Sequence, residues 1–278
     1  MINYIENYFD LALLKLSEVK LHEATESNRL RNIYNRISKS KYLINPVIVG
    51  KYNNDTILLD GANRYGSLRE IGCKLILAQV LNYKDKSLRL EKWNHLIYDF
   101  ELDNLKTFCN KSDLQYTSVS YSEGMKAMEN KFHYLHAADV NRNENILISL
   151  SGDLDKLLMQ LEKITKTYFG IYDFDRSECD IKYSDLRKYT RKKGTLIVFP
   201  DFQKQHIISI ANSNLRLPAG ISRHRIQNRV LHVKYEIKKL MSDTKIGEKT
   251  EELKKMLMIK IDKNKVRQYE ESVIVFDE

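Results

Sequence analysis

The stretch Leu58-Leu59-Asp60-Gly61-Ala62-Asn63-Arg64-Tyr65 joins the end of an apolar run to the start of a helical pattern. Only Asp60 and Gly61 separate the two leucines from that pattern. A glycine at position 61 lets the backbone approach a ligand closely, and the free N–H groups at a helix start can bind phosphate oxygens. Arg64, in the first turn, can add a charge-assisted hydrogen bond to the same anion. The stretch therefore predicts a phosphate-binding site formed by Gly61, Ala62, Asn63 and Arg64. The alternative is that Arg64 is only a solvated charge on a helix.

Asp60 ends the predicted strand beside this phosphate site. Mg²⁺ is usually held by one or two carboxylates together with substrate phosphates and water. We therefore predict Asp60 as a catalytic residue and as the metal ligand. The alternative is that Asp60 only caps the helix that follows it.

The residues around this stretch predict a compact α+β unit. Apolar runs at 47–49 and 56–59 predict a β-hairpin, because turn-forming residues at 52–55 separate them. The neighbouring patterns predict two helices and a strand, over 29–38, 62–71 and 75–81 respectively, with Gly72 ending the second helix.

The rest of the chain predicts a second α/β region. We expect a mainly helical segment over 86–144, with Trp93 and His95 on one of its helices. Further strands are predicted over 145–150, 196–200, 230–235 and 272–276, and helices over 153–168, 182–193, 204–211 and 248–261. The predicted organisation is an α+β fold with an N-terminal domain at 1–85 that carries the phosphate site, a connecting segment at 86–144 and a mixed C-terminal α/β domain at 145–278, which contributes a loop at 217–225 to a ligand pocket.

Composition excludes several classes of protein. The chain has 278 residues and a net charge of +9, which suits an anionic partner without identifying it. No run reaches the ~18 apolar residues of a membrane span, and the N-terminal residues do not resemble a secretory signal. Three widely spaced cysteines, Cys73, Cys109 and Cys179, form neither a metal pair nor a disulfide framework. We therefore expect a cytoplasmic protein that does not bind membranes.

Two further stretches carry side chains capable of chemistry. Glu23, on the loop before the first helix, can take a proton from a substrate hydroxyl, although by itself it resembles any surface glutamate. The loop at 217–225 offers a hydroxyl, a guanidinium and an imidazole at Ser222, Arg223 and His224, which can bind a carboxylate or a phosphate. The alternative is a basic loop on a basic protein.

Taken together and in this order, these features resemble one family. Residues 21–83 resemble the ParB/sulfiredoxin-like domain through the acidic loop, the helix, Asn45-Pro46-Val47-Ile48-Val49, the stretch at 60–65 and Gly72. Within that superfamily the chain is similar to the free L-serine kinases of siderophore clusters. The features that narrow the resemblance are Trp93-x-His95, Pro218-Ala219-Gly220-x-Ser222-Arg223 and Arg267-x-Tyr269-x-Glu271-x-Val273.

The resemblance implies Mg²⁺-dependent phosphoryl transfer from ATP or ADP to the hydroxyl of free L-serine. The product would be O-phospho-L-serine, for siderophore or other amino-acid-derived biosynthesis. Carried over by position, Glu23 would accept the hydroxyl proton and Asp60 would lie at the phosphate and metal. The residues that would bind serine and its carboxylate are Trp93, His95, Ser222, Arg223 and His224.

One position departs from the family pattern, because Asn63 stands where these kinases usually carry histidine. Asparagine can still donate a hydrogen bond to a phosphate, but it cannot be protonated.

Two other functions remain open at the level of sequence. The same domain, the positive charge and the basic helix over 182–193 also suit a ParB-type DNA-binding regulator without kinase activity, and DNA or haem could regulate a kinase of this type. Sulfiredoxin-like reductase chemistry would need a reactive cysteine next to the phosphate loop. Cys73 lies instead at the far end of the helix that follows that loop.

Overall fold

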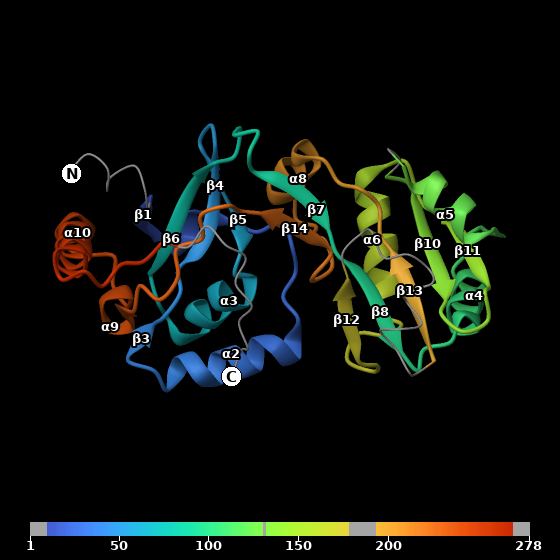
Figure 1. Cartoon of the computed structure of the whole chain (residues 1–278), viewed down its shortest axis with the longest axis horizontal. Helices are drawn as coiled ribbons and strands as arrows, with labels where there is room; N and C mark the ends of the chain where they lie inside the picture. Colours follow the sequence, from blue (N-terminus) through green and yellow to red (C-terminus); the bar gives the residue numbers. More distant parts are fainter. Residues whose placement is uncertain (1–9, 130–131, 178–192, 269–278) are drawn as a thin grey trace.

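A hairpin of β4 (Val47–Tyr52) and β5 (Asp55–Asp60) lies inside a five-stranded sheet (Figure 1). The structure, a computed structural model, describes residues 10–129, 132–177 and 193–268. The sheet order is β1-β6-β4-β5-β2, where the remaining strands are β1 (Leu11–Lys15), β6 (Leu75–Asn82) and β2 (Val19–Lys20). Neighbouring strands are antiparallel except for β4 with β6 and β2 with β5, which are parallel. The predicted hairpin is confirmed.

Both faces of β5 are buried, and each faces a different core. Ile57 and Leu59 belong to a large cluster shared with the second half of the molecule, whereas Leu58 belongs to the core of the first sheet. Successive strand residues point to opposite faces. This placement explains why the segment shows a continuous apolar run instead of alternation.

Helix α3 (Ala62–Ile71) begins directly after β5 and has the predicted bounds. Gly61 and Gly72 flank it in the left-handed conformation, with φ of 101° and 92°. Helix α2 (Ser27–Ser38) packs against α3, and Leu30 approaches Gly66 so closely that a Cβ at that position would lie 2.9 Å from it. The two helices therefore form one layer beside the sheet (Figure 1).

The C-terminal part of the described chain returns to the first sheet. Strand β15 (Tyr235–Glu236) pairs with β3 (Tyr42–Leu43), and it leads into α9 (Ile237–Leu240) and α10 (Ile246–Asp262). Leu253 of α10 is buried in the core of the first sheet. The domain boundaries predicted from sequence did not include this return of the chain to the first sheet. The boundaries themselves stay a prediction.

The second half of the molecule is built on a six-stranded sheet whose neighbours are all antiparallel. Its order is β12-β8-β13-β10-β11-β9, with β12 (Phe174–Ser177), β8 (Asn94–Tyr98), β13 (Gly194–Val198), β10 (Tyr134–Asp139), β11 (Asn145–Ser149) and β9 (Tyr116–Ser118). Four helices pack with it: α4 (Leu102–Lys111), α5 (Tyr121–Met128), α6 (Leu154–Thr165) and α8 (Lys204–Ala211). An α+β fold is confirmed.

The prediction of a mainly helical segment over 86–144 is wrong. This segment contains β7 (Arg89–Lys92), β8, β9 and β10 besides two helices, and Trp93 lies between β7 and β8. Leu96 and Ile97 face different cores, so β8 is buried on both sides. Burial on both faces removes the polar alternation by which a strand is recognised from sequence.

Three other predictions of strands and helices have different outcomes. Of the strand predicted over 230–235, only Tyr235 lies in a strand, β15. The helix predicted over 182–193 and the strand over 272–276 lie outside the described residues, apart from residue 193.

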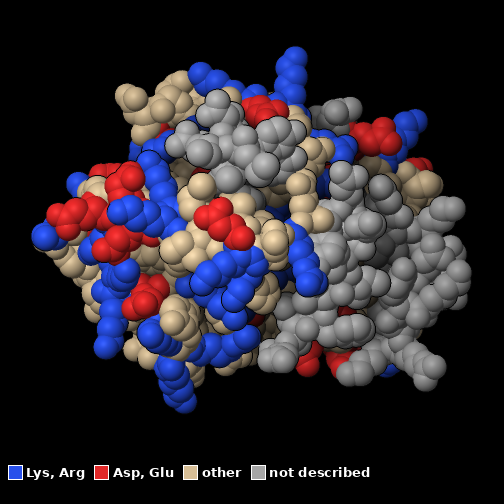
Figure 2. All heavy atoms as spheres, turned by 60° about the vertical axis from the view of Figure 1, so that its left-hand side comes forward, with Lys and Arg blue, Asp and Glu red and all other residues tan. Residues whose placement is uncertain are grey.

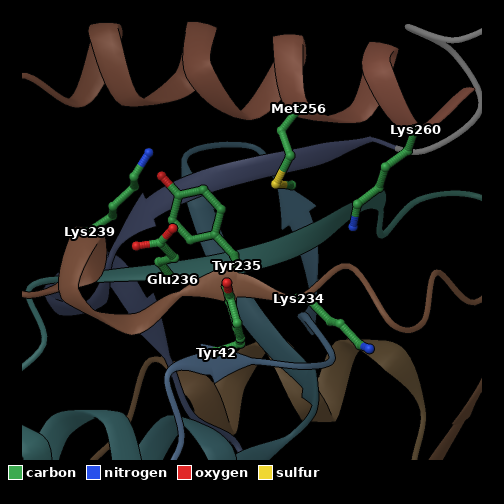
Figure 3. A pocket seen from close by; sticks show the side chains of 7 residues that line it. All are labelled: Tyr42, Lys234, Tyr235, Glu236, Lys239, Met256 and Lys260. Atoms are coloured by element: carbon green, nitrogen blue, oxygen red, sulfur yellow. The ribbon is translucent and has the colours of Figure 1, made fainter. Parts of the chain in front are cut away.

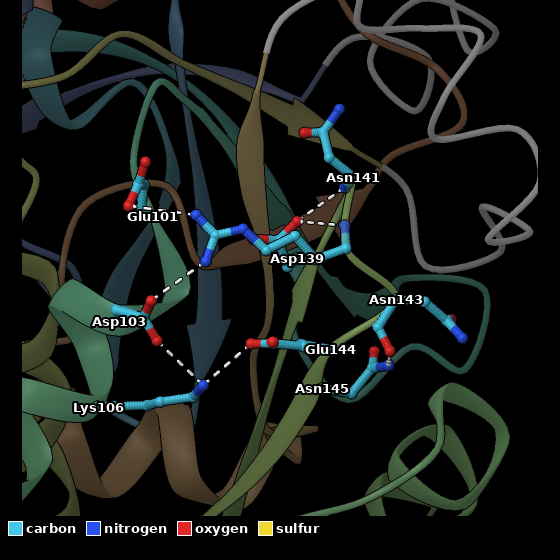
Figure 4. A network of polar contacts seen from close by, with 9 residues as sticks. Glu101, Asp103, Lys106, Asp139, Asn141, Asn143, Glu144 and Asn145 are labelled. Carbon is cyan, nitrogen blue, oxygen red and sulfur yellow. Dashed lines mark hydrogen bonds and ion pairs between the residues drawn. The ribbon is translucent and has the colours of Figure 1, made fainter.

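Ion pairs join the start of α4 to the turn between β10 and β11 (Figure 4). Arg142 pairs with Glu101 and Asp103 at 3.4 and 3.2 Å, and Lys106 pairs with Asp103 and Glu144 at 3.1 and 3.0 Å. These side chains are partly exposed to solvent, so each ion pair contributes little to stability.

Among the described residues, no helix combines the length and the apolar character needed to cross a membrane.

Candidate functional site

Glu23 and Asp60 lie at the same edge of the five-stranded sheet. Strands β2 and β5 run parallel, with Lys20 opposite Ile57 as their last pair. Glu23 lies three residues after Lys20, and Asp60 lies three residues after Ile57. Because the carboxyl ends of neighbouring parallel strands meet at one edge, both residues follow their strands at the same edge of the sheet.

The segment that carries Glu23 leaves this edge and pairs with the loop before β14 (Ser222–Arg225). Ala24 N–H donates to the carbonyl of Leu217 at 2.8 Å, and Leu217 N–H donates to the carbonyl of His22 at 2.9 Å. The Glu23 carboxylate accepts hydrogen bonds from Gly220 N–H and, at 2.8 Å, from the Ser222 hydroxyl. Residues about 200 positions apart are thereby joined around one carboxyl group.

The environment of Glu23 suits a group that takes up a proton near neutral pH. Burial raises the pKa of Glu23 from 4.5 to about 7, although the hydrogen bonds from Ser222 and Gly220 and the charge of Arg176 act in the opposite direction. A carboxyl group with this pKa is part ionised at pH 7, and both its protonation states are accessible.

Arg176, on β12, is a residue of this site that sequence reasoning missed. Its guanidinium lies against Gly220, where an added Cβ would collide with it, and it donates to Glu26 at 3.3 Å. Its Nε is buried without a hydrogen-bond partner in the described structure. No motif surrounds this arginine, so nothing in the sequence distinguishes it from other basic residues.

Two buried histidines extend the polar contacts behind Glu23. His22 Nε2 lies 2.9 Å from the Ser222 hydroxyl, and His224 Nε2 lies 3.0 Å from the Tyr83 hydroxyl. Burial lowers the pKa of His22 to about 4 and also lowers that of His224. Both imidazoles are therefore neutral near pH 7, and His224 lies in the interior against Tyr83.

Arg223 and Trp93 form a pair on the other face of β14. Strand alternation directs Arg223 away from Ser222 and His224. Its guanidinium lies 4.1 Å from the centre of the Trp93 ring, a cation–π contact, and 3.8 Å from Glu91. The structure thus places Ser222 at Glu23 but separates it from the Arg223–Trp93 pair.

His95 lies inside the second core, with aromatic rings of Phe169, Phe174 and Phe199 around it. Its two ring nitrogens contact the Tyr168 hydroxyl at 2.7 Å and the Gly220 carbonyl at 2.9 Å. A fully buried imidazole with both nitrogens engaged has no atom left to offer a ligand.

The predicted phosphate loop has the required backbone conformation. Gly61 takes a φ of 101°, and a Cβ there would lie 2.8 Å from both Val47 Cγ1 and Arg64 Nη2. Asp60 Oδ2 accepts from Arg64 at 2.8 Å and pairs with Arg229 at 3.1 Å. Two guanidinium groups and the start of α3 therefore lie at the end of β5, which is an arrangement that favours anions.

Arg229 is a second residue that the sequence did not reveal, and a buried glutamine fixes the segment that carries it. Gln79 of β6 donates from its amide to the carbonyl of Asn228 at 2.7 Å and accepts from Val230 N–H at 3.0 Å. This two-point contact holds Arg229 beside Asp60, although the two residues are 169 positions apart in the sequence.

The oxygen groups at the start of α3 fit a Mg²⁺ ion held partly by phosphates. Asp60 supplies a carboxylate, of which Oδ2 takes part in both ion pairs, and Asn63 has a buried Oδ1 without a hydrogen-bond partner in the described structure. Mg²⁺ needs only one or two protein oxygens when phosphates complete its coordination. In the described residues, no cluster of three His, Cys, Asp or Glu side chains provides a metal site made by protein alone.

Two surface pockets lie away from Glu23 and Asp60. One, of about 370 Å³, lies between α10 and the β3–β15 pair and is lined by Tyr42, Lys234, Tyr235, Glu236, Lys239, Met256 and Lys260 (Figure 3). The other, of about 490 Å³, lies along β7 and is lined partly by Lys86, Arg89 and Lys204. Neither includes a residue that contacts Glu23.

Comparison with known proteins relates the chain to serine kinases. No family model matches it. A curated relative, the ATP-dependent L-serine kinase SbnI of Staphylococcus aureus (strain NCTC 8325 / PS 47), is 20% identical over 257 residues, which is 87% of each chain.

Solved structures share the fold. SbnI with a C-terminal truncation from Staphylococcus aureus matches with a TM-score of 0.71 over 91% of this chain and 97% of its own, at 20% identity. A free serine kinase in complex with AMP matches with a TM-score of 0.70 over 84% of this chain and 95% of its own, at 14% identity. A variant of a free serine kinase with one glutamate replaced by alanine, in complex with ADP, matches with a TM-score of 0.69 at 14% identity.

Proposed function

We propose that this chain is a phosphotransferase that phosphorylates free L-serine. The observation that carries the proposal is the pairing of a proton-accepting carboxyl group, Glu23, with an anion-binding strand-to-helix junction at Asp60 on the same sheet edge. The named activity of SbnI and of the free serine kinases that share this fold supports it.

In the proposed reaction the serine hydroxyl attacks the terminal phosphoryl group of ATP or ADP. The new serine O–P bond forms while the bond from that phosphorus to the bridging oxygen breaks, and the shortened nucleotide leaves. Glu23 accepts the hydroxyl proton, which its raised pKa allows. Gly220 and Ser222 hold the carboxylate in place by their hydrogen bonds. The product is O-phospho-L-serine.

The phosphate groups would lie at the N-terminus of α3. Gly61 lets them approach the backbone, and Arg64 and Arg229 supply positive charge. Asp60 and Asn63 would hold Mg²⁺, which neutralises charge on the transferred group when bound. The histidine of the family pattern is absent at 63, so the protein contribution there is a neutral amide oxygen or amide N–H.

Arg176 would bind the carboxylate of the amino acid. Its positive charge lowers the pKa of Glu23, and its buried Nε has no hydrogen-bond acceptor in the described structure. Arg223, expected from sequence to take this role, lies over Trp93 on the opposite face of its strand.

The proposal is tested by incubating the purified chain with Mg²⁺, L-serine and either ATP or ADP and detecting phosphoserine by mass. We expect Glu23→Gln to lower kcat by about 10²–10⁴-fold, the typical contribution of a general base. Glu18→Gln, a change at an exposed glutamate, is the matched control and should leave kcat unchanged. Absence of phosphoserine with both nucleotides would contradict the proposal.

A DNA-binding regulator is the weaker alternative. The relatives are named as kinases, and none of the names mentions DNA or haem, so we propose neither ligand. Acidic side chains lie among the basic ones on the described part of the face in Figure 2, where a duplex would favour a continuous basic surface. Reductase chemistry is not supported either, because burial raises the pKa of Cys73 to about 11 and so disfavours its reactive thiolate.

We further propose a cytoplasmic location, where nucleotide donors are available. The described cysteines, Cys73 and Cys109, are buried and free, in keeping with a reducing compartment. The product would enter siderophore or other amino-acid-derived biosynthesis.

A further inference from the structure

A line of hydrogen bonds runs from the second core to the carboxyl group of Glu23. The Tyr168 hydroxyl contacts His95 Nδ1 at 2.7 Å, His95 Nε2 contacts the Gly220 carbonyl at 2.9 Å, and Gly220 N–H donates to Glu23 Oε1. Tyr168 and His95 are completely buried. Two residues of the second sheet region thus connect to a side chain at the edge of the first sheet.

The chemistry of the partners assigns each proton in this line. A carbonyl oxygen only accepts, so His95 must carry its proton on Nε2 and donate it to Gly220. Nδ1 is then the acceptor and the Tyr168 hydroxyl donates to it. Burial lowers the pKa of His95 to about 3 and raises that of Tyr168, so the neutral imidazole and the phenol persist over the working pH range. One tautomer is therefore fixed.

His95 holds the carbonyl of Gly220, a residue whose backbone conformation is special. It takes a φ of 75°, in the left-handed region that glycine adopts without strain, and the Arg176 guanidinium occupies the space where a Cβ would lie. The carbonyl that His95 holds and the N–H that donates to Glu23 belong to the two peptide units on either side of the Gly220 Cα. Both are held by hydrogen bonds, so together they restrict the φ and ψ rotations of Gly220 that set the direction of its N–H.

We infer that His95 and Tyr168 are positioning residues for phosphoryl transfer, which act by restricting the backbone of Gly220 and so hold the carboxylate of Glu23 toward the substrate hydroxyl. This inference rests on the proposed function and changes the expectation from sequence that His95 binds serine. Neither side chain touches the substrate, and each acts by orienting a group that does.

The first test compares kinetics of His95→Phe, His95→Gln and Tyr168→Phe. We expect kcat to fall about 10–100-fold in His95→Phe, since a displaced catalytic group costs rate in this range. The KM for nucleotide should stay unchanged, because the phosphate loop is on another strand. His95→Gln retains an N–H donor for Gly220 and should recover much of the loss. Tyr172→Phe is the matched control, because Tyr172 packs on Phe100 and not on His95.

The pH profile separates positioning from general damage. The groups that face Glu23 are Ser222 on β14, Arg176 on β12 and the adjacent His22, and all remain in the variants. Weakening the Gly220 hydrogen bond removes a contact that favours the ionised carboxylate. The ascending limb of kcat should therefore move above pH 7 in His95→Phe and Tyr168→Phe but not in Tyr172→Phe. An unchanged limb together with an unchanged kcat would overturn the inference.

A readout without turnover distinguishes failure of this inference from failure of the proposed function. In a double-mutant cycle, unfolding of Glu23→Gln, His95→Phe and the double variant is measured against pH. If the hydrogen bonds from Tyr168 through His95 and Gly220 act on Glu23, the change in unfolding free energy caused by Glu23→Gln should have a different pH midpoint in the wild type than in His95→Phe. If the wild type makes no phosphoserine yet this coupling is present, the proposed function fails and the positioning contact stands. Additive effects at every pH would overturn the contact itself.

Discussion

At the scale of single residues, the proposed chemistry depends on a carboxyl group whose surroundings oppose its charge. Burial raises the pKa of Glu23 to about 7, more than Ser222, Gly220 and Arg176 lower it. A surface glutamate in the same sequence would be ionised throughout the physiological range. The property that makes Glu23 suitable as a base therefore comes from its position, and it also carries a stability cost that can be measured.

Replacing Glu23 by glutamine should change stability in a pH-dependent way. Because the folded-state pKa exceeds the ordinary value of 4.5, the wild type loses stability relative to Glu23→Gln as pH rises from 4.5 through 7. At about 1.4 kcal/mol per pH unit, the pH-dependent part of the difference reaches roughly 3 kcal/mol above pH 7 and is absent below pH 4. Urea unfolding at pH 4, 6 and 8 measures it, with Glu18→Gln as the control. A difference that does not vary with pH would contradict the raised pKa.

At the scale of the elements, the junction of β5 and α3 joins a buried strand to a helix start without any intervening loop. The left-handed Gly61 makes this possible, and the close approach of Val47 and Arg64 leaves no room for a side chain. The backbone N–H groups and the pairing of Arg64 with Asp60 depend on this turn.

Gly61→Ala should therefore affect nucleotide binding more than serine binding. We expect KM for the nucleotide to rise at least tenfold and the free energy of unfolding to fall by about 1–3 kcal/mol, the usual cost of a non-glycine residue in this conformation. Steady-state kinetics and urea unfolding measure the two effects. Gly152→Ala, where an added Cβ meets nothing within 4 Å, is the matched control. A normal nucleotide KM in Gly61→Ala would argue against phosphate binding at this turn.

At the scale of the whole molecule, the candidate site exists because the chain returns to its beginning. The loop before β14 brings Gly220 and Ser222 to Glu23, and the segment around Arg229 reaches Asp60. Further along, α10 covers the first sheet with Leu253. The candidate site and the core of the first sheet are thus completed by residues from beyond position 216.

Leu253→Ala should lower the free energy of unfolding by about 2–5 kcal/mol, the range for removing a buried leucine side chain. Ile259→Ala on the same helix is the control, since that side chain is 52% exposed and should change stability by less than about 0.5 kcal/mol. Denaturant unfolding measures both. Equal effects of the two changes would mean that α10 does not contribute to the core of the first sheet.

By itself the sequence determined the local features: the hairpin of β4 and β5, the bounds of α3, the glycine turn at 61 and the presence of Glu23 and Asp60 as candidate groups. These follow from short-range patterns of apolar residues, turn formers and caps.

Only the tertiary structure decided that Arg176 and Arg229 lie at the site. It also decided that Ser222 bonds to Glu23 while Arg223 faces away, and that His95 is enclosed in the core. The physical reason is that these contacts join residues that are 44 to 199 positions apart. The sequence around one residue of such a pair does not indicate which residue its partner is. Strand β8 is buried on both faces, so its sequence lacks the alternation of polar and apolar residues that would have predicted a strand.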